Sequence, residues 1–198
     1  MTTTNATRMT ADQFWEWCAR PEQENKSFEL DEGEVIEVPP PGERHGTLCL
    51  WIGHLLLNYV LGRGQGGVTS NDTALIIEEN PGVVRGPDLM VFADSRSYNR
   101  LSPGPVRRIP QLVVEVASPS DSWSSLIRRV EQYLTRGVPL VWVVDPEAQT
   151  VSVFRRDEHP RILSDQDELT GNGELPGLSL RISTIFQTPG TPDEMPES

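Results

Sequence analysis

The sequence has almost no lysine and no long apolar run. Lys26 is the one lysine among 17 basic residues, and the acidic residues outnumber these so far that the formal net charge is -12. Such a protein gains little from the general electrostatic attraction that drives non-specific DNA binding, so any nucleic-acid contact must use a local basic surface. No apolar stretch approaches the roughly 20 residues that span a bilayer, and the polar first eight residues lack the apolar centre of a signal peptide. We therefore expect a cytoplasmic protein without membrane contact.

Cysteine is scarce as well. Cys18 and Cys49 fall in segments that read as helical, and neither has a CxxC partner or nearby histidine ligands. We therefore expect reduced thiols and no zinc site, which suits a cytoplasmic location. The glycine cluster at residues 62–67 lacks the GK[ST] ending of a phosphate loop and follows no strand. It is interpreted as a helix stop and flexible loop, and no nucleotide cofactor is expected.

Apolar periodicity predicts an α/β chain. A short helix over residues 11–18 is capped by Thr10, and residues 27–38 read as two strands around an Asp-Glu-Gly turn. Apolar residues at three- and four-residue steps predict a long amphipathic helix from about 43 to 61. A second helix is expected at 122–136, capped by Ser120 or Asp121. Further strands are expected at 73–78, 88–92, 111–117, 140–144 and 150–155.

This order of elements predicts one domain built on a mixed β-sheet flanked by helices. A chain of 198 residues is long enough for one compact core, which we place at residues 10–187. Residues 1–9 are expected to be disordered. The tail at 188–198 is rich in proline and acids and cannot bury a core, so it is expected to be disordered too.

Two carboxylates require an explanation. Glu115 lies within the apolar run Leu112–Ala117, where burial of a charge costs several kcal/mol unless it is paired, protonated or bound to a cation. Asp88 follows Pro87 at the start of the preceding strand. If these strands pair antiparallel, the two carboxylates converge at one end of the sheet, and hard oxygen ligands suit Mg²⁺ or Mn²⁺. The residues alone also allow a half-exposed Glu115 and an Asp88 that merely opens a turn.

Several further segments recur in a specific order and spacing. They are Phe28–Gly33, His45 at the start of the long helix, Arg85–Asp88, Val114–Ser120, Tyr133 with Gly137-Val138, and Val141–Pro146. Together they resemble the bacterial Uma-two family of the PD-(D/E)xK nuclease superfamily, from about Thr10 to Phe186. The resemblance implies a restriction-endonuclease-like fold and a metal-dependent endonuclease that acts on DNA.

The same resemblance assigns roles to individual residues. It makes Asp88 and Glu115 the metal ligands and Glu29 a third acidic member, which holds a metal-bound water or the metal itself. It also implies that His45 faces the site. From the residues alone, Glu29 reads as a surface charge on a hairpin, and His45 reads as a histidine satisfied at a helix start.

The chain departs from the superfamily pattern at one position. The lysine normally found two residues after the glutamate is replaced by Ala117. In the Uma-two family this lysine lies on the following helix, fourteen residues after the glutamate and four before the tyrosine, and both spacings lead to Arg129. Arginine can stabilise negative charge in phosphoryl transfer but cannot give up its proton as a base. The alternative is that Arg129, like Arg128 beside it, lies on a solvated helix face.

The sequence is consistent with three functions. The first is a Mg²⁺- or Mn²⁺-dependent hydrolase of DNA phosphodiester bonds, for which a twofold homodimer would suit double-strand cutting. The second is a catalytically weakened nuclease-fold protein that binds metal, nucleic acid or a protein partner. The third is an assembly module that forms a homodimer. For the first function, the catalytic residues are expected to be Glu29, His45, Asp88, Glu115 and Arg129.

Overall fold

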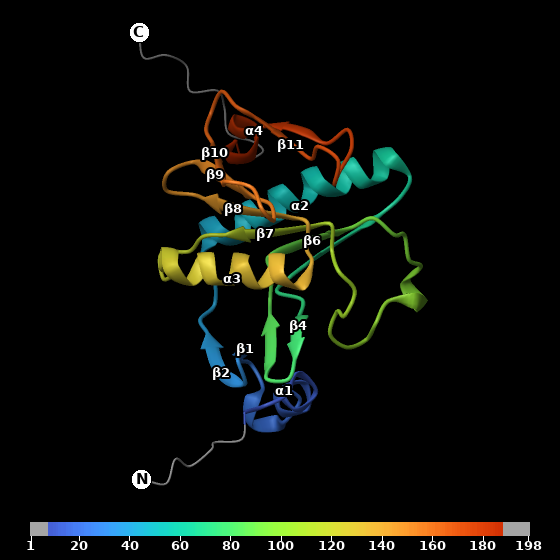
Figure 1. The fold of residues 1–198 in the computed structure, drawn as a ribbon, viewed down its shortest axis with the longest axis vertical. Coiled ribbons are helices and arrows are strands. Elements are labelled where there is room, and N and C mark those ends of the chain that lie inside the picture. Colours follow the sequence, from blue (N-terminus) through green and yellow to red (C-terminus); the bar gives the residue numbers. More distant parts are fainter. Residues whose placement is uncertain (1–7, 188–198) are drawn as a thin grey trace.

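A six-stranded mixed sheet forms the central layer of the structure, a computed structural model that describes residues 8–187 (Figure 1). The helix α2 (Glu43–Arg63) covers one face and α3 (Trp123–Arg136) covers the other. In spatial order the strands are β10 (Arg161–Leu163), β9 (Thr150–Phe154), β8 (Leu140–Asp145), β7 (Leu112–Val116), β6 (Leu89–Phe92) and β3 (Gly67–Ser70).

The pairing within this sheet confirms the predicted mixed α/β architecture. The strands β7 and β8 run parallel and are joined through α3, whereas every other neighbouring pair is antiparallel. A parallel pair needs a long crossover connection, and a helix of fourteen residues supplies it. The predicted hairpin of β8 and β9 is also confirmed.

A second sheet of four strands packs with the N-terminal helix α1 (Ala11–Cys18), which contributes the buried Phe14. Its strands are β2 (Glu34–Val38), β1 (Ser27–Asp31), β5 (Gly82–Arg85) and β4 (Leu75–Glu79), in that spatial order. The hairpin of β1 and β2 was predicted. Only three residues, 86–88, separate β5 from β6, so this short link joins the two sheets and ends at Asp88.

The remaining elements are short and lie outside the two main sheets. They are η1 (Pro21–Gln23), η2 (Tyr98–Arg100), β11 (Glu168–Thr170), β12 (Ser179–Arg181) and α4 (Ile182–Phe186). The strands β11 and β12 pair with each other, and α4 packs beside α2.

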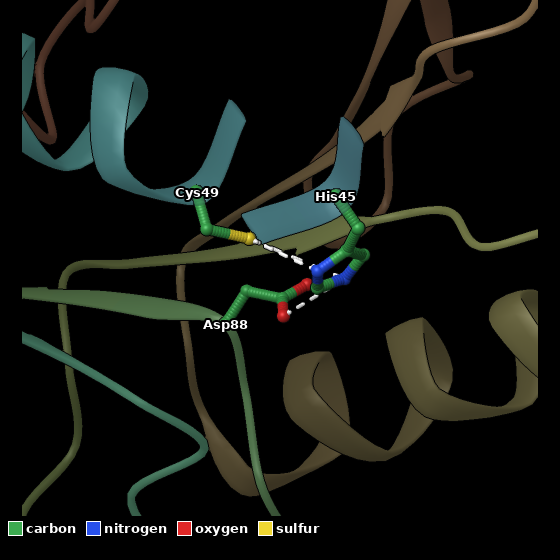
Figure 2. Close-up of side chains that lie close together, drawn as sticks. All are labelled: His45, Cys49 and Asp88. Atoms are coloured by element: carbon green, nitrogen blue, oxygen red, sulfur yellow. Dashed lines mark hydrogen bonds and ion pairs between the residues drawn. The ribbon is translucent and has the colours of Figure 1, made fainter. Parts of the chain in front are cut away.

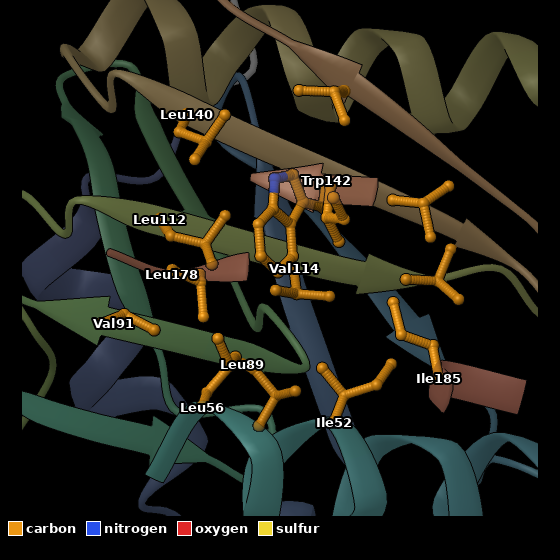
Figure 3. Packing of buried hydrophobic residues seen from close by; sticks show 14 of the residues in the cluster. Ile52, Leu56, Leu89, Val91, Leu112, Val114, Leu140, Trp142, Leu178 and Ile185 are labelled. Atoms are coloured by element: carbon orange, nitrogen blue, oxygen red, sulfur yellow. The ribbon is translucent and has the colours of Figure 1, made fainter. Parts of the chain in front are cut away.

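The main apolar core lies between the central sheet and α2 (Figure 3). Along α2 the buried residues recur every four positions, at Leu48, Ile52, Leu56 and Val60, so one helix face contacts the sheet. Trp142 of β8 is fully buried against this face. The core therefore holds the first turns of α2, including residues 45 and 49, in a fixed position over the sheet.

Several local expectations need correction. The glycine cluster stops α2 as expected, with Gly64 as the C-cap, but its last residue, Gly67, begins β3. The strand β5 was missed because only Val83, Val84 and Arg85 lie between the glycines of Pro81-Gly82 and Gly86-Pro87. The N-cap of α3 is Ser122, whose hydroxyl accepts a hydrogen bond from the backbone of Ser125. Asp121, one of the two expected caps, is engaged elsewhere.

The chain ends were expected to be disordered, and residues 1–7 and 188–198 lie outside the described residues. Met9, which falls in the first of these expected segments, is described. Its backbone N–H donates to Gly33 and its carbonyl accepts from Gly82. Across residues 8–187, no helix combines the length and apolar character needed to cross a membrane.

Candidate active site

The antiparallel pairing of β6 and β7 brings Asp88 and Glu115 to the same end of the central sheet. Leu89 is the register partner of Val114. Because the strands are antiparallel, Asp88, which precedes Leu89, and Glu115, which follows Val114, lie together at that end of the sheet. The Oδ2 atom of Asp88 accepts a hydrogen bond from the backbone N–H of Val116 at 2.6 Å. Only 8% of Asp88 and 4% of Glu115 is exposed, so the half-exposed alternative for Glu115 is wrong.

The Glu115 carboxylate is held by α3. The hydroxyl of Tyr133 donates a 2.5 Å hydrogen bond to Oε1, and Nε of Arg129 lies 3.4 Å from Oε2. Burial raises the pKa of Glu115 to about 8, against the opposing effect of Arg129, and nearby Asp88 adds to the rise. Arg129 thus offsets only part of the cost of a negative charge on the buried Glu115.

Arg129 lies inside this site and not on a solvated helix face. Its side chain is 16% exposed, and its guanidinium donates to Asp121 at 2.9 Å. Among the described residues, its buried Nε has no hydrogen-bond partner. The i,i+4 spacing of Arg129 and Tyr133 directs both side chains at Glu115. Arg128, in contrast, is half-exposed and pairs with Asp31 and Glu32.

On its other side, Asp88 meets the first turns of α2 (Figure 2). The Nε2 atom of His45 lies 3.1 Å from Oδ1 of Asp88, and Sγ of Cys49 lies 3.4 Å from Nδ1 of the same imidazole. The hydrogen bond to Asp88 raises the pKa of His45. His45 therefore faces the site, and it is satisfied by Asp88 and not by the backbone of the helix start.

The expectation that Cys49 has no histidine nearby also needs correction. His45 precedes Cys49 by four residues, which in a helix places the two side chains on one face. One potential ligand atom from each of His45, Cys49 and Asp88 lies within 4.8 Å of the others. The sequence spacing alone carried this signal, because both residues fall in the predicted long helix.

Glu29 lies close to the carboxylate pair but has its own partners. Its side chain on β1 is 12% exposed, so it is not a surface charge on a hairpin. One oxygen accepts from the Arg85 guanidinium at 2.8 Å, and the other accepts from the backbone N–H of Gly86 at 3.0 Å. Its negative charge nevertheless contributes to the raised pKa of Glu115.

Arg85 is a buried residue that the sequence analysis did not assign to the site. Besides Glu29, its guanidinium contacts Asp31 at 2.9 Å and donates to Gln132 of α3 at 2.8 Å. Gln132 in turn donates to Asp31 at 2.9 Å. This network joins the four-stranded sheet to α3 and thereby fixes the position of Glu29. Its members are far apart in the sequence, so no spacing predicted it.

Two further acids complete the surroundings. Asp121 accepts from the backbone N–H of Ser118 and from Arg129, both at 2.9 Å. The pKa of Asp72 is raised by partial burial and by the neighbouring Asp88. The loop that carries Asp72 packs against Gly86, where an added Cβ would lie 3.0 Å from the Asp72 carbonyl oxygen. The site is consequently rich in carboxylates.

Comparison with known proteins agrees with this architecture. A family model described as "Uma2: Putative restriction endonuclease" matches residues 11–183. Among solved structures, the chain is similar to the crystal structure of a protein described as "a putative nuclease belonging to DUF820" from Anabaena variabilis ATCC 29413. The two are 21% identical, with a TM-score of 0.76 over 90% of this chain and 97% of that chain, a likeness that shows the fold. No curated protein matches the sequence.

The Arg85 network generates a prediction about stability. In Arg85→Met, the partly buried carboxylates of Glu29 and Asp31 lose the buried cation that they share, and breaking a buried ion pair costs about 3–5 kcal/mol. We expect the free energy of unfolding, measured with urea, to fall by about that amount. In the control Arg128→Met, the lost ion pairs are half-exposed, and the expected decrease is below about 1 kcal/mol. Equal losses in both variants would contradict the structural role of Arg85.

Proposed function

Because this chain belongs to the Uma2 family, we propose that it is a metal-dependent endonuclease that hydrolyses phosphodiester bonds in DNA. The observation that supports this most directly is the meeting of Asp88 and Glu115 at one end of the sheet, beside the guanidinium of Arg129. A pair of buried acids with a cationic side chain next to them is suited to holding a divalent cation and a phosphate together.

The donor set fits Mg²⁺ or Mn²⁺. These hard cations prefer carboxylate oxygens, and Asp88 and Glu115 supply such oxygens from two adjoining strands. Arg129 offsets only part of the cost of ionising Glu115, so a bound cation would favour the carboxylate form. We assign Glu29 the role of third acidic member. Its oxygens accept from Arg85 and Gly86, and a carboxylate has about four acceptor positions, so capacity remains for a water.

When bound, the cation would supply Lewis-acid screening of the scissile phosphate and would acidify a water. Residues of the chain position the ligands and contact the phosphate. Tyr133 holds one oxygen of Glu115, and His45 with the Val116 N–H holds the carboxylate of Asp88. Arg129 is assigned to the phosphate: its Nε–H, which has no hydrogen-bond partner within residues 8–187, can donate to an oxygen on which negative charge develops.

A second candidate function is supported by the residue at the lysine position. Ala117 stands there and Arg129 is held between Glu115 and Asp121, so the role of the lysine falls to a side chain that cannot release a proton to serve as a base. The net charge of -12 also opposes non-specific DNA binding. A catalytically weakened member that binds metal, nucleic acid or a protein partner is the alternative consistent with both observations.

The proposal includes two features of the protein's setting. A twofold homodimer would present two sites to the two strands of a duplex. A cytoplasmic location would give access to DNA and would keep the free thiols of Cys18 and Cys49 reduced.

The metal-dependent function predicts a specific effect of Glu115→Gln. This variant keeps the size of the side chain but removes the charge that holds the cation. Loss of groups that only support a ligand already costs roughly 10–100-fold in metal affinity or activity, so we expect loss of at least about 100-fold here. Binding is measured by Mn²⁺ titration, and cleavage is measured on circular duplex DNA and on RNA, with chelator as blank.

The matched control is Glu131→Gln, which removes the same charge from an exposed position on α3. It should bind Mn²⁺ and cleave as the wild type does, and thermal unfolding should show both variants folded. Metal affinity in Glu115→Gln equal to that of the wild type would refute the site. Cleavage of RNA but not DNA would show that the substrate is RNA.

The second candidate predicts the outcome of Arg129→Lys. If the arginine limits the reaction because it cannot release a proton, lysine should raise or create cleavage. A general base contributes roughly 10²–10⁴-fold, so even partial recovery should increase the rate about 10-fold or more. Arg128→Lys, on the exposed side of the same turn, should leave the rate unchanged. A clear loss of cleavage in Arg129→Lys would show instead that arginine itself is the group the reaction uses.

A further inference from the structure

Three side chains of different chemistry meet on the α2 side of Asp88. Figure 2 shows His45 and Cys49 directed from the helix toward the carboxylate. Among the described residues, this is the cluster that brings three potential metal ligands within 4.8 Å of one another, and it combines a nitrogen, a sulfur and an oxygen. Glu115, on the α3 side of the sheet, is not a member.

The spacing of these atoms resembles that of a zinc site. With Zn–N, Zn–O and Zn–S bonds of usual length and tetrahedral angles, ligand atoms lie about 3.3–3.6 Å apart. The Nε2 atom of His45 lies 3.1 Å from Oδ1 of Asp88 and 4.0 Å from Sγ of Cys49. Small rotations of the three side chains would close these differences. Three protein ligands would leave a fourth position for water, as in open zinc sites.

The cluster is also held in place before any ion arrives. His45 and Cys49 are one turn apart on a helix that the buried Leu48 and Ile52 fix to the sheet. The Val116 N–H fixes the other oxygen of Asp88. A site on rigid elements loses little conformational entropy on binding.

We propose that His45, Cys49 and Asp88 form a second cation site, for a thiophilic divalent ion such as Zn²⁺, and that its occupation withdraws Asp88 from the Mg²⁺ or Mn²⁺ site. The thiol binds as thiolate and its proton goes to solvent. Sulfur and imidazole ligands select for Zn²⁺ over Mg²⁺. Zn²⁺ would therefore bind Asp88 together with His45 and Cys49, whereas Mg²⁺ would bind Asp88 together with Glu115. The competition rests on the proposed function, whereas the cation site does not.

Cobalt spectroscopy of the reduced, full-length chain tests the site without any reference to cleavage. Co²⁺ bound through a thiolate gives an absorption band in the near ultraviolet, and Zn²⁺ should displace it. We expect the band in the wild type, in Cys18→Ser and in Glu115→Gln. Cys49→Ser and Cys49→Ala should both lose it. Their Co²⁺ affinity should be lower by at least about 10-fold, because even the loss of a group that only supports a ligand costs roughly 10–100-fold.

Thermal unfolding checks that the two Cys49 variants remain folded, and agreement between them guards against a defect peculiar to one. A wild type without the band would overturn the proposal. So would an unchanged band in both Cys49 variants, or its loss in Cys18→Ser.

The competition is measured by the electron paramagnetic resonance signal of Mn²⁺, which falls when the ion binds. Added Zn²⁺ should release bound Mn²⁺ from the wild type, and about 10-fold more Zn²⁺ should be needed with Cys49→Ser. Simultaneous binding of Zn²⁺ and Mn²⁺ would refute the shared carboxylate. A chain that shows the cobalt band but binds no Mn²⁺ would refute the proposed function and the competition, and would leave the thiophilic site established.

Discussion

The carboxylate of Glu115, buried at the end of β7, is the constraint on which the rest of this site depends. A negative charge inside an apolar strand is tolerated only if it is paired, hydrogen-bonded or bound to a cation. Tyr133 and Arg129 meet part of that requirement from one face of α3. The antiparallel partner strand then adds a second acid, Asp88, where the first is already incompletely balanced. A divalent cation bound between these two acids would supply the positive charge that stabilises both carboxylates in their ionised form.

Asp88 connects the parts of the molecule that converge on this point. It is the last residue of the short link between the two sheets, accepts from the Val116 backbone and pairs with His45 of α2. The carboxylate of Glu115 lies toward α3, whereas imidazole and thiol groups approach Asp88 from α2. One carboxylate therefore stands between two ligand environments of different softness. The identity of the bound ion then decides whether Asp88 binds it together with Glu115 or together with His45 and Cys49.

Much of this arrangement could be predicted from the sequence, because its signals are local. An acid inside the apolar run at 112–117 and an aspartate after Pro87 indicated the meeting of two strand ends. Arg129 was indicated by the family resemblance, through the spacings to Glu115 and Tyr133. Other features gave weak signals or none. The strand β5 is too short for a periodic pattern, and Arg85 contacts residues 56 and 47 positions away. The pairing of His45 and Cys49 was visible as helical spacing, but His45, four residues before Cys49, was not counted as a nearby ligand.

The central claim is that Asp88 and Glu115 share one divalent cation. It is tested most directly by anomalous diffraction from crystals of the wild-type chain grown with Mn²⁺. The account predicts an anomalous peak in contact with a carboxylate oxygen of each residue, at about 2.0–2.3 Å, the range for hard cations of this size. A well-diffracting crystal with no peak between these two carboxylates, or with Mn²⁺ bound only elsewhere, would contradict it.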